Sequence, residues 1–424
     1  MKYNFECYGL YMISKMVTNA IRSKVVMKEE IDIDVMRHAI NVAMKRYPYF
    51  KKQLTIDETG AYVLEPNDQD VVVLKTRKKM PDLCSEEVNR HLLYVDCERN
   101  ICYFNFSHTL AGGKGILPWI QTCIYQYVVE KYEFVPNAEC IRKPDSELLP
   151  GENTEPTLEL AQDAIELSRD KCRNAFVPIK DYLSSALNPF KRSHEYFTFT
   201  FDAKELVGMS TVTDNSVNSI ICVLMLKALD KVIPAKCDKI TAQIPHNPAS
   251  ALGIPNNRNN VLSYVFIPFK RNVARKTLEQ LGTITRGAIF LQTDSAYSRN
   301  DVKRTMEYWN GIDSVTGYKE KLTYAKQHDL LQGRQALHAS YVVSYTGFTD
   351  WGELIDYVES YCFIVDGHQT LELSAIGDKI ICNYMQVIRT DKYVDAFKKT
   401  LEENGIPYKV EGPFKKNLPI HRLE

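Results

Sequence analysis

Apolar side chains recur at steps of three and four residues in several long segments of the chain. Over residues 33–47 they form a regular stripe that Asp32 can cap and Pro48 ends, so the pattern predicts an amphipathic helix. The same spacing over residues 116–128 predicts a second helix, in which Pro118 is tolerated because it falls in the first turn. Further helices are predicted at residues 216–232, 273–287 and 391–404, and in a polar stretch that runs to residue 327.

Shorter segments rich in β-branched and aromatic residues lie between these helices, as is typical of strands. They fall at residues 61–64, 71–74, 101–106, 196–201, 262–268 and 339–345, and a hairpin is predicted to turn at residues 376–379. Strands and helices alternate without the GxGxxG signature of a doubly wound nucleotide-binding fold. The pattern therefore predicts an α/β (α+β) protein in which mixed sheets are flanked by helices.

A reversal of charge near the middle of the chain indicates a connection between two domains. Residues 145–170 carry eight acidic residues and one arginine, whereas residues 171–192 carry five basic residues and one aspartate. Such a charged, proline-containing segment is typical of an exposed linker. We therefore predict a first domain at residues 1–165, a linker at 166–195 and a second domain at 196–424.

The composition limits the classes of partner. The chain has 424 residues, which is too many for one compact core. Of these residues 45% are apolar, and this fraction excludes intrinsic disorder. Its 53 basic residues balance 53 acidic ones, so no overall positive field would hold nucleic acid. No apolar stretch reaches the roughly 20 residues that span a bilayer. We expect a monomer that binds small molecules or another protein.

The 11 cysteines indicate a reducing environment. The first residues contain no apolar segment typical of a signal peptide, and no CxxC pair occurs, so we expect a cytoplasmic protein with free thiols. Cys97 and Cys102 have no histidine at ligand spacing, and we predict no metal site.

One histidine stands at a position suited to chemistry. His108 follows the predicted strand 101–106 and opens a loop of small residues that leads into the helix at 116–128. A strand end fixes the imidazole, glycines let a substrate approach the backbone, and a pKa near 6.5 suits proton abstraction at neutral pH. The alternative is a buried structural histidine beside a tight turn. A nucleophilic role for Ser107 finds no support, because no GxSxG elbow surrounds it.

Residues 106–113, FSHTLAGG, resemble the HHxxxDG motif of the CoA-dependent acyltransferase superfamily. That group includes chloramphenicol acetyltransferase, peptide-synthetase condensation domains, alcohol acetyltransferases and polyketide-associated acyltransferases. The opening helix at 33–47, the IPHN and LGIP segments between residues 244 and 255, and the stretch VSYTG followed by DWG at 343–352 match family features in the same order. The resemblance spans about residues 1–405.

Two motif positions depart from the family. Ser107 stands where the first histidine is usual and Gly112 where the aspartate is usual, while His108 matches the catalytic histidine. In the family that aspartate pairs with an arginine to hold the loop. The arginine of the family's V-N-x-R segment has no direct match here, and Arg258 is the nearest candidate. The resemblance implies two chloramphenicol-acetyltransferase-like lobes with a tunnel between them and His108 at its middle.

The implied activity is transfer of an acyl group from acyl-CoA, or from acyl-pantetheine on an acyl carrier protein, to an alcohol or amine. His108 would be the general base, and no permanently bound cofactor is expected. The remaining candidates support the oxyanion and the loop (Gly112, Gly113, Ser344, Tyr345) or line the tunnel (Ser107, Asn260, Asp350, Trp351). Asp350 could instead cap a helix at residues 353–361. The alternative function is a catalytically silent, condensation-like binding or docking module; a plain hydrolase would need a nucleophile that the sequence does not supply.

Overall fold

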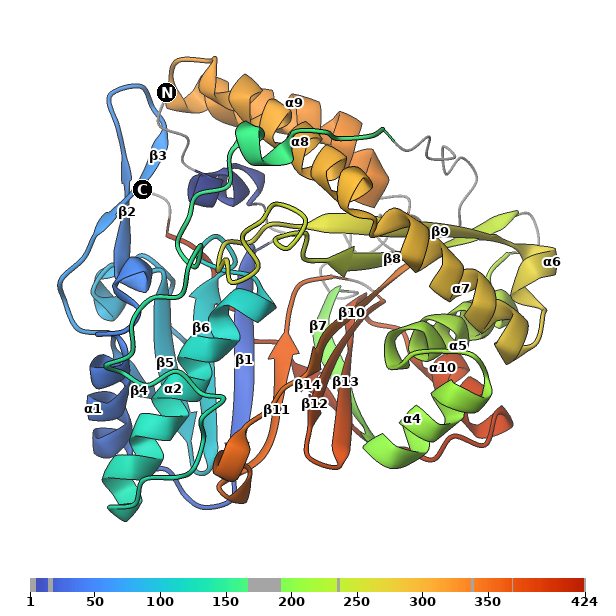
Figure 1. The fold of residues 1–424 in the computed structure, drawn as a ribbon, viewed down its shortest axis with the longest axis horizontal. Coiled ribbons are helices and arrows are strands. Elements are labelled where there is room, and N and C mark those ends of the chain that lie inside the picture. The colour runs from blue at the N-terminus through green and yellow to red at the C-terminus, as the bar shows by residue number, and fades with distance from the viewer. Residues whose placement is uncertain are drawn as a thin grey trace.

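The computed structural model describes residues 5–13, 18–166, 192–234, 237–336, 339–367 and 369–422. It consists of two lobes, each built on a mixed sheet with helices against it (Figure 1), as the sequence predicts. Most of the predicted linker, residues 167–191, lies outside the described residues, and the domain boundaries along the chain stay a prediction.

The first lobe is a five-stranded sheet in the order β11-β1-β6-β5-β4. Its strands are β1 (Ala20–Met27), β4 (Val73–Lys75), β5 (Leu93–Glu98), β6 (Ile101–Ser107) and β11 (Val358–Ile364). Helices α1 (Ile33–Ala43) and α2 (Gly113–Tyr132) pack against each other and against this sheet (Figure 1). Both helices lie where the apolar spacing predicts them, and the Asp32 side chain caps α1. The expected place of Pro118 is wrong, because α2 begins at Gly113 and Pro118 therefore lies inside the helix, beyond its first turn.

Smaller elements surround this lobe. They are the hairpin of β2 (Lys52–Ile56) and β3 (Tyr62–Pro66), and the short 3-10 helices η1 (Phe5–Met12), η2 (Pro48–Phe50), η3 (Glu86–Val88) and η4 (Leu158–Ala161). The hairpin and η1 lie on the side of the lobe where the chain begins (Figure 1).

The second lobe is a seven-stranded sheet in the order β14-β7-β13-β12-β10-β8-β9. Its strands are β7 (Arg192–Asp202), β8 (Lys239–His246), β9 (Ser263–Lys270), β10 (Tyr341–Phe348), β12 (Thr370–Ile376), β13 (Lys379–Ile388) and β14 (Lys409–Lys415). Its helices are α4 (Ala203–Val212), α5 (Val217–Val232), α6 (Arg271–Ala274), α7 (Leu278–Gln292) and α10 (Lys392–Glu403). Helix α5 is buried along most of its length, as its apolar sequence predicts.

The second half of the chain contributes elements to the first lobe. Strand β11 lies far along the second half of the chain, yet it pairs antiparallel with β1 at the edge of the first sheet. Helices α8 (Ser295–Asp313) and α9 (Tyr318–Ala336) extend over the first lobe, where α9 contacts η1 (Figure 1). The first lobe is therefore completed by residues from the second half, so we expect neither half of the chain to fold well alone.

Two predicted helices differ from the structure. The helix expected at 273–287 is split into α6 and α7, because the Thr277 side chain accepts a hydrogen bond from the Gln280 amide and starts a new helix. The alternative prediction of a helix at 353–361 is wrong, because Gly352–Asp356 form a 3-10 helix, η6, and strand β11 follows it. Its sequence VESYCFI combines β-branched and aromatic residues that fit a pleated surface.

Within the described residues, no single helix is long and apolar enough to cross a membrane, although α4 and α5 pass that test as a pair bent by 78°.

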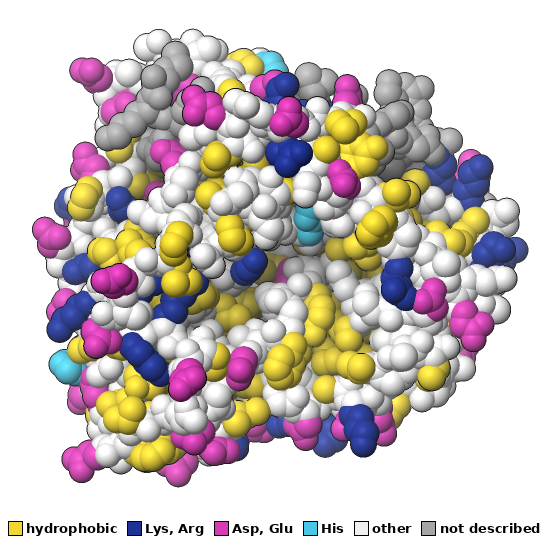
Figure 2. All heavy atoms as spheres, viewed as in Figure 1, with side chains coloured by type: hydrophobic (Ala, Val, Ile, Leu, Met, Phe, Trp, Pro, Cys, Tyr) yellow, Lys and Arg dark blue, Asp and Glu magenta, His cyan; other side chains and the backbone are white. Residues whose placement is uncertain are grey.

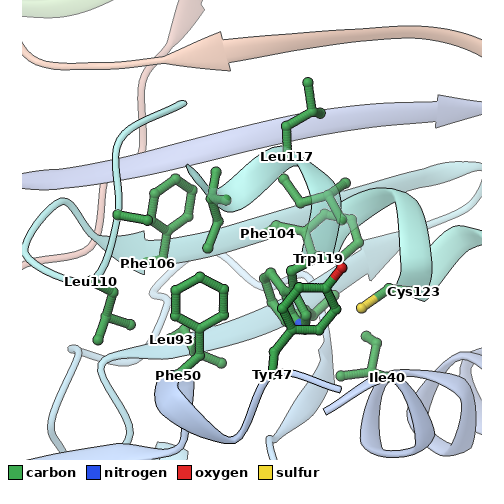
Figure 3. Close-up of a cluster of buried hydrophobic side chains, with 14 of the residues drawn as sticks. Ile40, Tyr47, Phe50, Leu93, Phe104, Phe106, Leu110, Leu117, Trp119 and Cys123 are labelled. Atoms are coloured by element: carbon green, nitrogen blue, oxygen red, sulfur yellow. The ribbon is translucent and has the colours of Figure 1, made fainter. Parts of the chain in front are cut away.

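Aromatic side chains fill the core of the first lobe between the sheet and its helices. Figure 3 shows Tyr47, which follows α1, and Phe50 of η2 packed with Phe104 of β6 and Trp119 of α2. Leu110, from the loop that follows β6, points into the same cluster and is fully buried (Figure 3). A buried leucine of this kind contributes about 1.5–3 kcal/mol, so the loop is anchored to the core.

Candidate active site

His108 follows the last residue of β6, a strand that pairs with neighbours on both sides. The backbone N–H of His108 donates to the Asn19 carbonyl at 2.8 Å. Its half-buried side chain faces a cavity of about 140 Å³. The cavity walls come from both halves of the chain and include Glu6, Asn19, Asn260, Tyr264 and Trp309.

Hydrogen bonding fixes which nitrogen of His108 carries the proton. Nδ1 lies 3.0 Å from the carbonyl oxygen of Ala111, and because a carbonyl can only accept, Nδ1–H is the donor. Nε2 is therefore the unprotonated nitrogen of the neutral ring. Burial lowers the pKa of His108 below its usual value, while the bond to Ala111 opposes that effect. The imidazole is neutral at pH 7 and can accept a proton.

Arg258 holds the loop that carries His108. Its Nη1 donates to the Leu110 carbonyl at 2.8 Å, and its Nε donates to the Asn153 side chain at 2.8 Å. Its Nη2 is paired with Glu6, and the guanidinium lies 4.6 Å from the ring centre of Tyr49. The arginine that the sequence left open thus contacts the loop backbone, without an aspartate at the motif position.

Asn260 occupies the space next to Gly112. A Cβ atom added at Gly112 would lie 3.2 Å from Oδ1 of Asn260, a tighter contact than side chains normally make. The Oδ1 atom is buried and has no hydrogen-bond partner among the described residues. Asn260 lines the cavity beside His108, and an aspartate at position 112 would crowd its Oδ1.

The N-terminus of α2 meets the second lobe through glycines. Gly112 is its N-cap, and a Cβ at Gly113 would lie 3.2 Å from Cγ2 of Thr346 on β10. At Gly115 the added Cβ would lie 2.0 Å from the carbonyl oxygen of Arg258. First-turn amides of a helix have no intrahelical acceptor and carry partial positive charge. The close approach therefore places a positive helix end between the lobes.

A row of polar residues crosses the sheet of the second lobe. Ser344 of β10 pairs in register with Glu372 of β12, which pairs with Asn383 of β13. Asn383 Nδ2 donates to the carbonyl of Phe363 in β11 at 2.9 Å, so this face looks toward the first lobe. Burial raises the pKa of Glu372 to about 7, and the Ser344 hydroxyl opposes the rise. Tyr345, the other hydroxyl candidate, packs against the core of the second lobe.

The other predicted tunnel residues lie elsewhere. Ser107 is fully buried, and its Oγ bonds to Nε2 of His421 at 2.8 Å. Trp351 is buried in the core of the first lobe. Asp350 accepts a hydrogen bond from the Gly352 amide at 2.9 Å, which shapes the turn before η6. None of the three is among the described residues that line the cavity at His108.

A second cavity, of about 640 Å³, shares Glu6 with the first. Its walls come from η1, the β2–β3 hairpin and the start of α9, and they include Lys52, Tyr62, Arg258, Asn259 and Lys321. Asn259 is buried, and its Oδ1 has no hydrogen-bond partner among the described residues. The neighbouring residues Asn259 and Asn260 thus each line one of the two cavities. Figure 2 shows the molecular surface hollowed between the two lobes.

Comparison with solved structures finds matches over the full length of the chain. Polyketide synthase associated protein 5 from Mycobacterium tuberculosis matches with a TM-score of 0.59 at 11% identity, covering 95% of this chain and 96% of that one. TRI101 of F. sporotrichioides, complexed with coenzyme A and T-2, matches with a TM-score of 0.58 at 9% identity, covering 95% and 98%. The first condensation domain of the CDA synthetase matches at 0.58 and 10%, covering 98% and 97%.

The chain shares the fold of these structures. This confirms the resemblance drawn from the His108 motif at the level of the fold. No protein-family model matches the sequence, and no curated protein matches it either. The same fold therefore persists here with little sequence in common.

No sequence pattern points to several of the residues that lie near His108. Asn19 and Glu6, which line its cavity, belong to the first residues of the chain. His421, near the end of the chain, is buried against Ser107. The only sign of them in the sequence is a single polar residue among the residues of each segment. No group of three or more His, Cys, Asp or Glu side chains that could hold a metal ion occurs in the part of the chain that the structure describes.

Proposed function

We propose that the protein is an acyltransferase that moves an acyl group from a CoA or carrier-protein thioester to an alcohol or amine, with His108 as general base. The observation that carries the proposal is the bond from His108 Nδ1 to the Ala111 carbonyl, which leaves Nε2 unprotonated at a cavity. It is supported by the fold, which the chain shares with an acetyltransferase named for trichothecenes and with TRI101 complexed with coenzyme A.

The reaction follows from that geometry. Nε2 of His108 takes the proton of the acceptor hydroxyl or amine as its oxygen or nitrogen attacks the thioester carbonyl. The tetrahedral intermediate then collapses, the carbon–sulfur bond breaks, and the leaving thiolate takes the proton back from His108. Holding donor and acceptor together between rigid lobes replaces a bimolecular encounter by an intramolecular step. No acyl-enzyme forms, because the acceptor itself attacks the thioester carbonyl.

Two groups are proposed to stabilise the oxyanion. The first-turn amides at Gly112 and Gly113 carry the positive end of α2. The Ser344 hydroxyl lies on the face of the second sheet that looks toward the first lobe, and it would turn from Glu372 to donate to the oxyanion. Donors of this kind are typically worth about 10²–10³ in rate. Tyr345 is the weaker candidate, since its ring packs against the second core.

The two cavities suggest a division between the substrates. The larger, of about 640 Å³, lies in the usual range of ligand pockets and is assigned to the acyl-pantetheine arm. The smaller, of about 140 Å³, holds the reacting end of the acceptor beside His108. Oδ1 of Asn260 would accept a hydrogen bond from a hydroxyl or amine there, while Tyr264 and Trp309 give an apolar wall.

The test is a panel of acyl-CoA donors of increasing chain length, and the same acyl groups on a pantetheinylated carrier protein, against alcohol and amine acceptors. We expect thiol release with at least one pair, together with an acceptor heavier by the acyl group in mass spectrometry. Binding of a thioester without transfer to any acceptor would contradict the proposal and favour the silent docking module.

A further inference from the structure

The last described segment of the chain connects the two lobes. It leaves β14 at Lys416, a buried residue whose backbone N–H donates to the His194 carbonyl at 2.7 Å and whose Nζ donates to the Gly367 carbonyl at 3.0 Å. In the first lobe, the Leu83 amide donates to the Ile420 carbonyl at 2.8 Å, and the Arg422 amide donates to the Leu83 carbonyl at 2.9 Å. The segment is thus fixed at both ends.

Between those anchors, His421 reaches the end of β6. Its Nε2 is hydrogen-bonded to Ser107 Oγ at 2.8 Å, across 314 positions of sequence. Both residues are buried, with 8% of His421 and none of Ser107 exposed. Burial lowers the pKa of His421 to about 4, so the ring is neutral at pH 7. A buried hydroxyl and a buried imidazole nitrogen each need a partner, and here Ser107 Oγ and His421 Nε2 bond to one another.

Ser107 is part of the turn that orients His108. Its Oγ accepts from the Thr109 amide at 3.2 Å, and its carbonyl accepts from the Leu110 amide at 3.0 Å. The same turn presents the Ala111 carbonyl that fixes the His108 ring. The conformation of Ser107 is therefore tied to the tautomer of His108.

We propose that His421 is a positioning residue: it holds Ser107, and through the turn at Ser107–Ala111 it keeps the His108 ring in its working orientation. The catalytic role of His108 belongs to the proposed function, on which this inference rests. In consequence, the tail from the second lobe completes the site in the first, and displacing that tail would weaken catalysis without touching a substrate.

The test compares His421→Ala, Ser107→Ala and the double variant with Ile420→Ala. Ile420 is the matched control because it precedes His421 in the same anchored segment and its side chain is 54% exposed. We expect kcat to fall about tenfold in both single variants with KM little changed, since misplacement of a catalytic group affects the reacting geometry. The double variant should lose no more than either single one. His421→Asn, whose amide can still bond to a hydroxyl, should recover part of the loss.

A second readout does not depend on activity. The ring nitrogen shifts of His108, assigned by their loss in His108→Ala, report its tautomer in NMR. Wild type should show the Nδ1–H form, and His421→Ala should show a mixture of tautomers. Unchanged shifts in His421→Ala and Ser107→Ala would overturn the proposal even if no acyl transfer is found. Equal losses of kcat in Ile420→Ala would also overturn it, because the tail would then act through its fold alone.

Discussion

Replacing His108 by alanine is expected to lower kcat/KM for acyl transfer by about 10²–10⁴-fold, the usual contribution of a general base. The thermal midpoint should change little. The side chain is only half buried, and in the described residues its one hydrogen bond is to the Ala111 carbonyl within its own loop. Thiol release followed with DTNB, on the donor and acceptor pair that wild type uses best, measures the loss.

His38→Ala is the matched control for this substitution. His38 lies on α1, its side chain is 71% exposed, and it pairs with Glu130. Its removal should leave both the rate and the midpoint unchanged within error. If His108→Ala releases thiol and acylates the acceptor as fast as wild type does, His108 is not the base.

Replacing Gly115 by alanine is expected to destabilise the protein strongly. The new Cβ would lie 2.0 Å from the carbonyl oxygen of Arg258, and backbone cannot rotate out of the way as a side chain can. Helix α2 would have to move away from the segment that contains Arg258, the residue that holds the His108 loop. Overpacking of this kind costs about 1–3 kcal/mol, and occasionally more. We expect a thermal midpoint lower by several degrees and, at permissive temperature, a large loss of acyl transfer.

Gly208→Ala is the control for the glycine substitution. Gly208 is exposed within α4, and an added Cβ would meet nothing within 4 Å. Alanine there should stabilise the helix by about 0.5–1 kcal/mol. Equal midpoints for Gly115→Ala and wild type in differential scanning calorimetry would show that α2 does not depend on this close approach.

Much of the fold and the centre of the site follow from local sequence. Helix α1 is set by apolar spacing with a cap at Asp32, and α5 by a long apolar run. His108 was found because a strand, a loop of small residues and a helix follow one another along the chain. The hairpin of β12 and β13 is also local, since its two strands are joined by a short turn.

Other features depend on contacts that sequence periodicity does not record. Strand β11 belongs to the second half of the chain, yet it joins the sheet of the first lobe by pairing with β1 at its edge. Arg258 reaches the Leu110 carbonyl across 148 positions, and a backbone acceptor has no sequence signature. The contact of His421 with Ser107 is of the same kind. Such long-range pairings decide how the loop is held, although the loop itself is locally encoded.

The most direct measurement is the dependence of kcat/KM on pH for the wild-type protein with its best donor and acceptor. The base acts in its neutral form, so the rate must fall as pH decreases through the pKa of His108. Burial lowers that pKa below 6.5, and the account therefore predicts full activity near pH 8 and a single ionisation with its midpoint below 6.5. A rate that rises as the pH decreases, or a midpoint above 7, would contradict it.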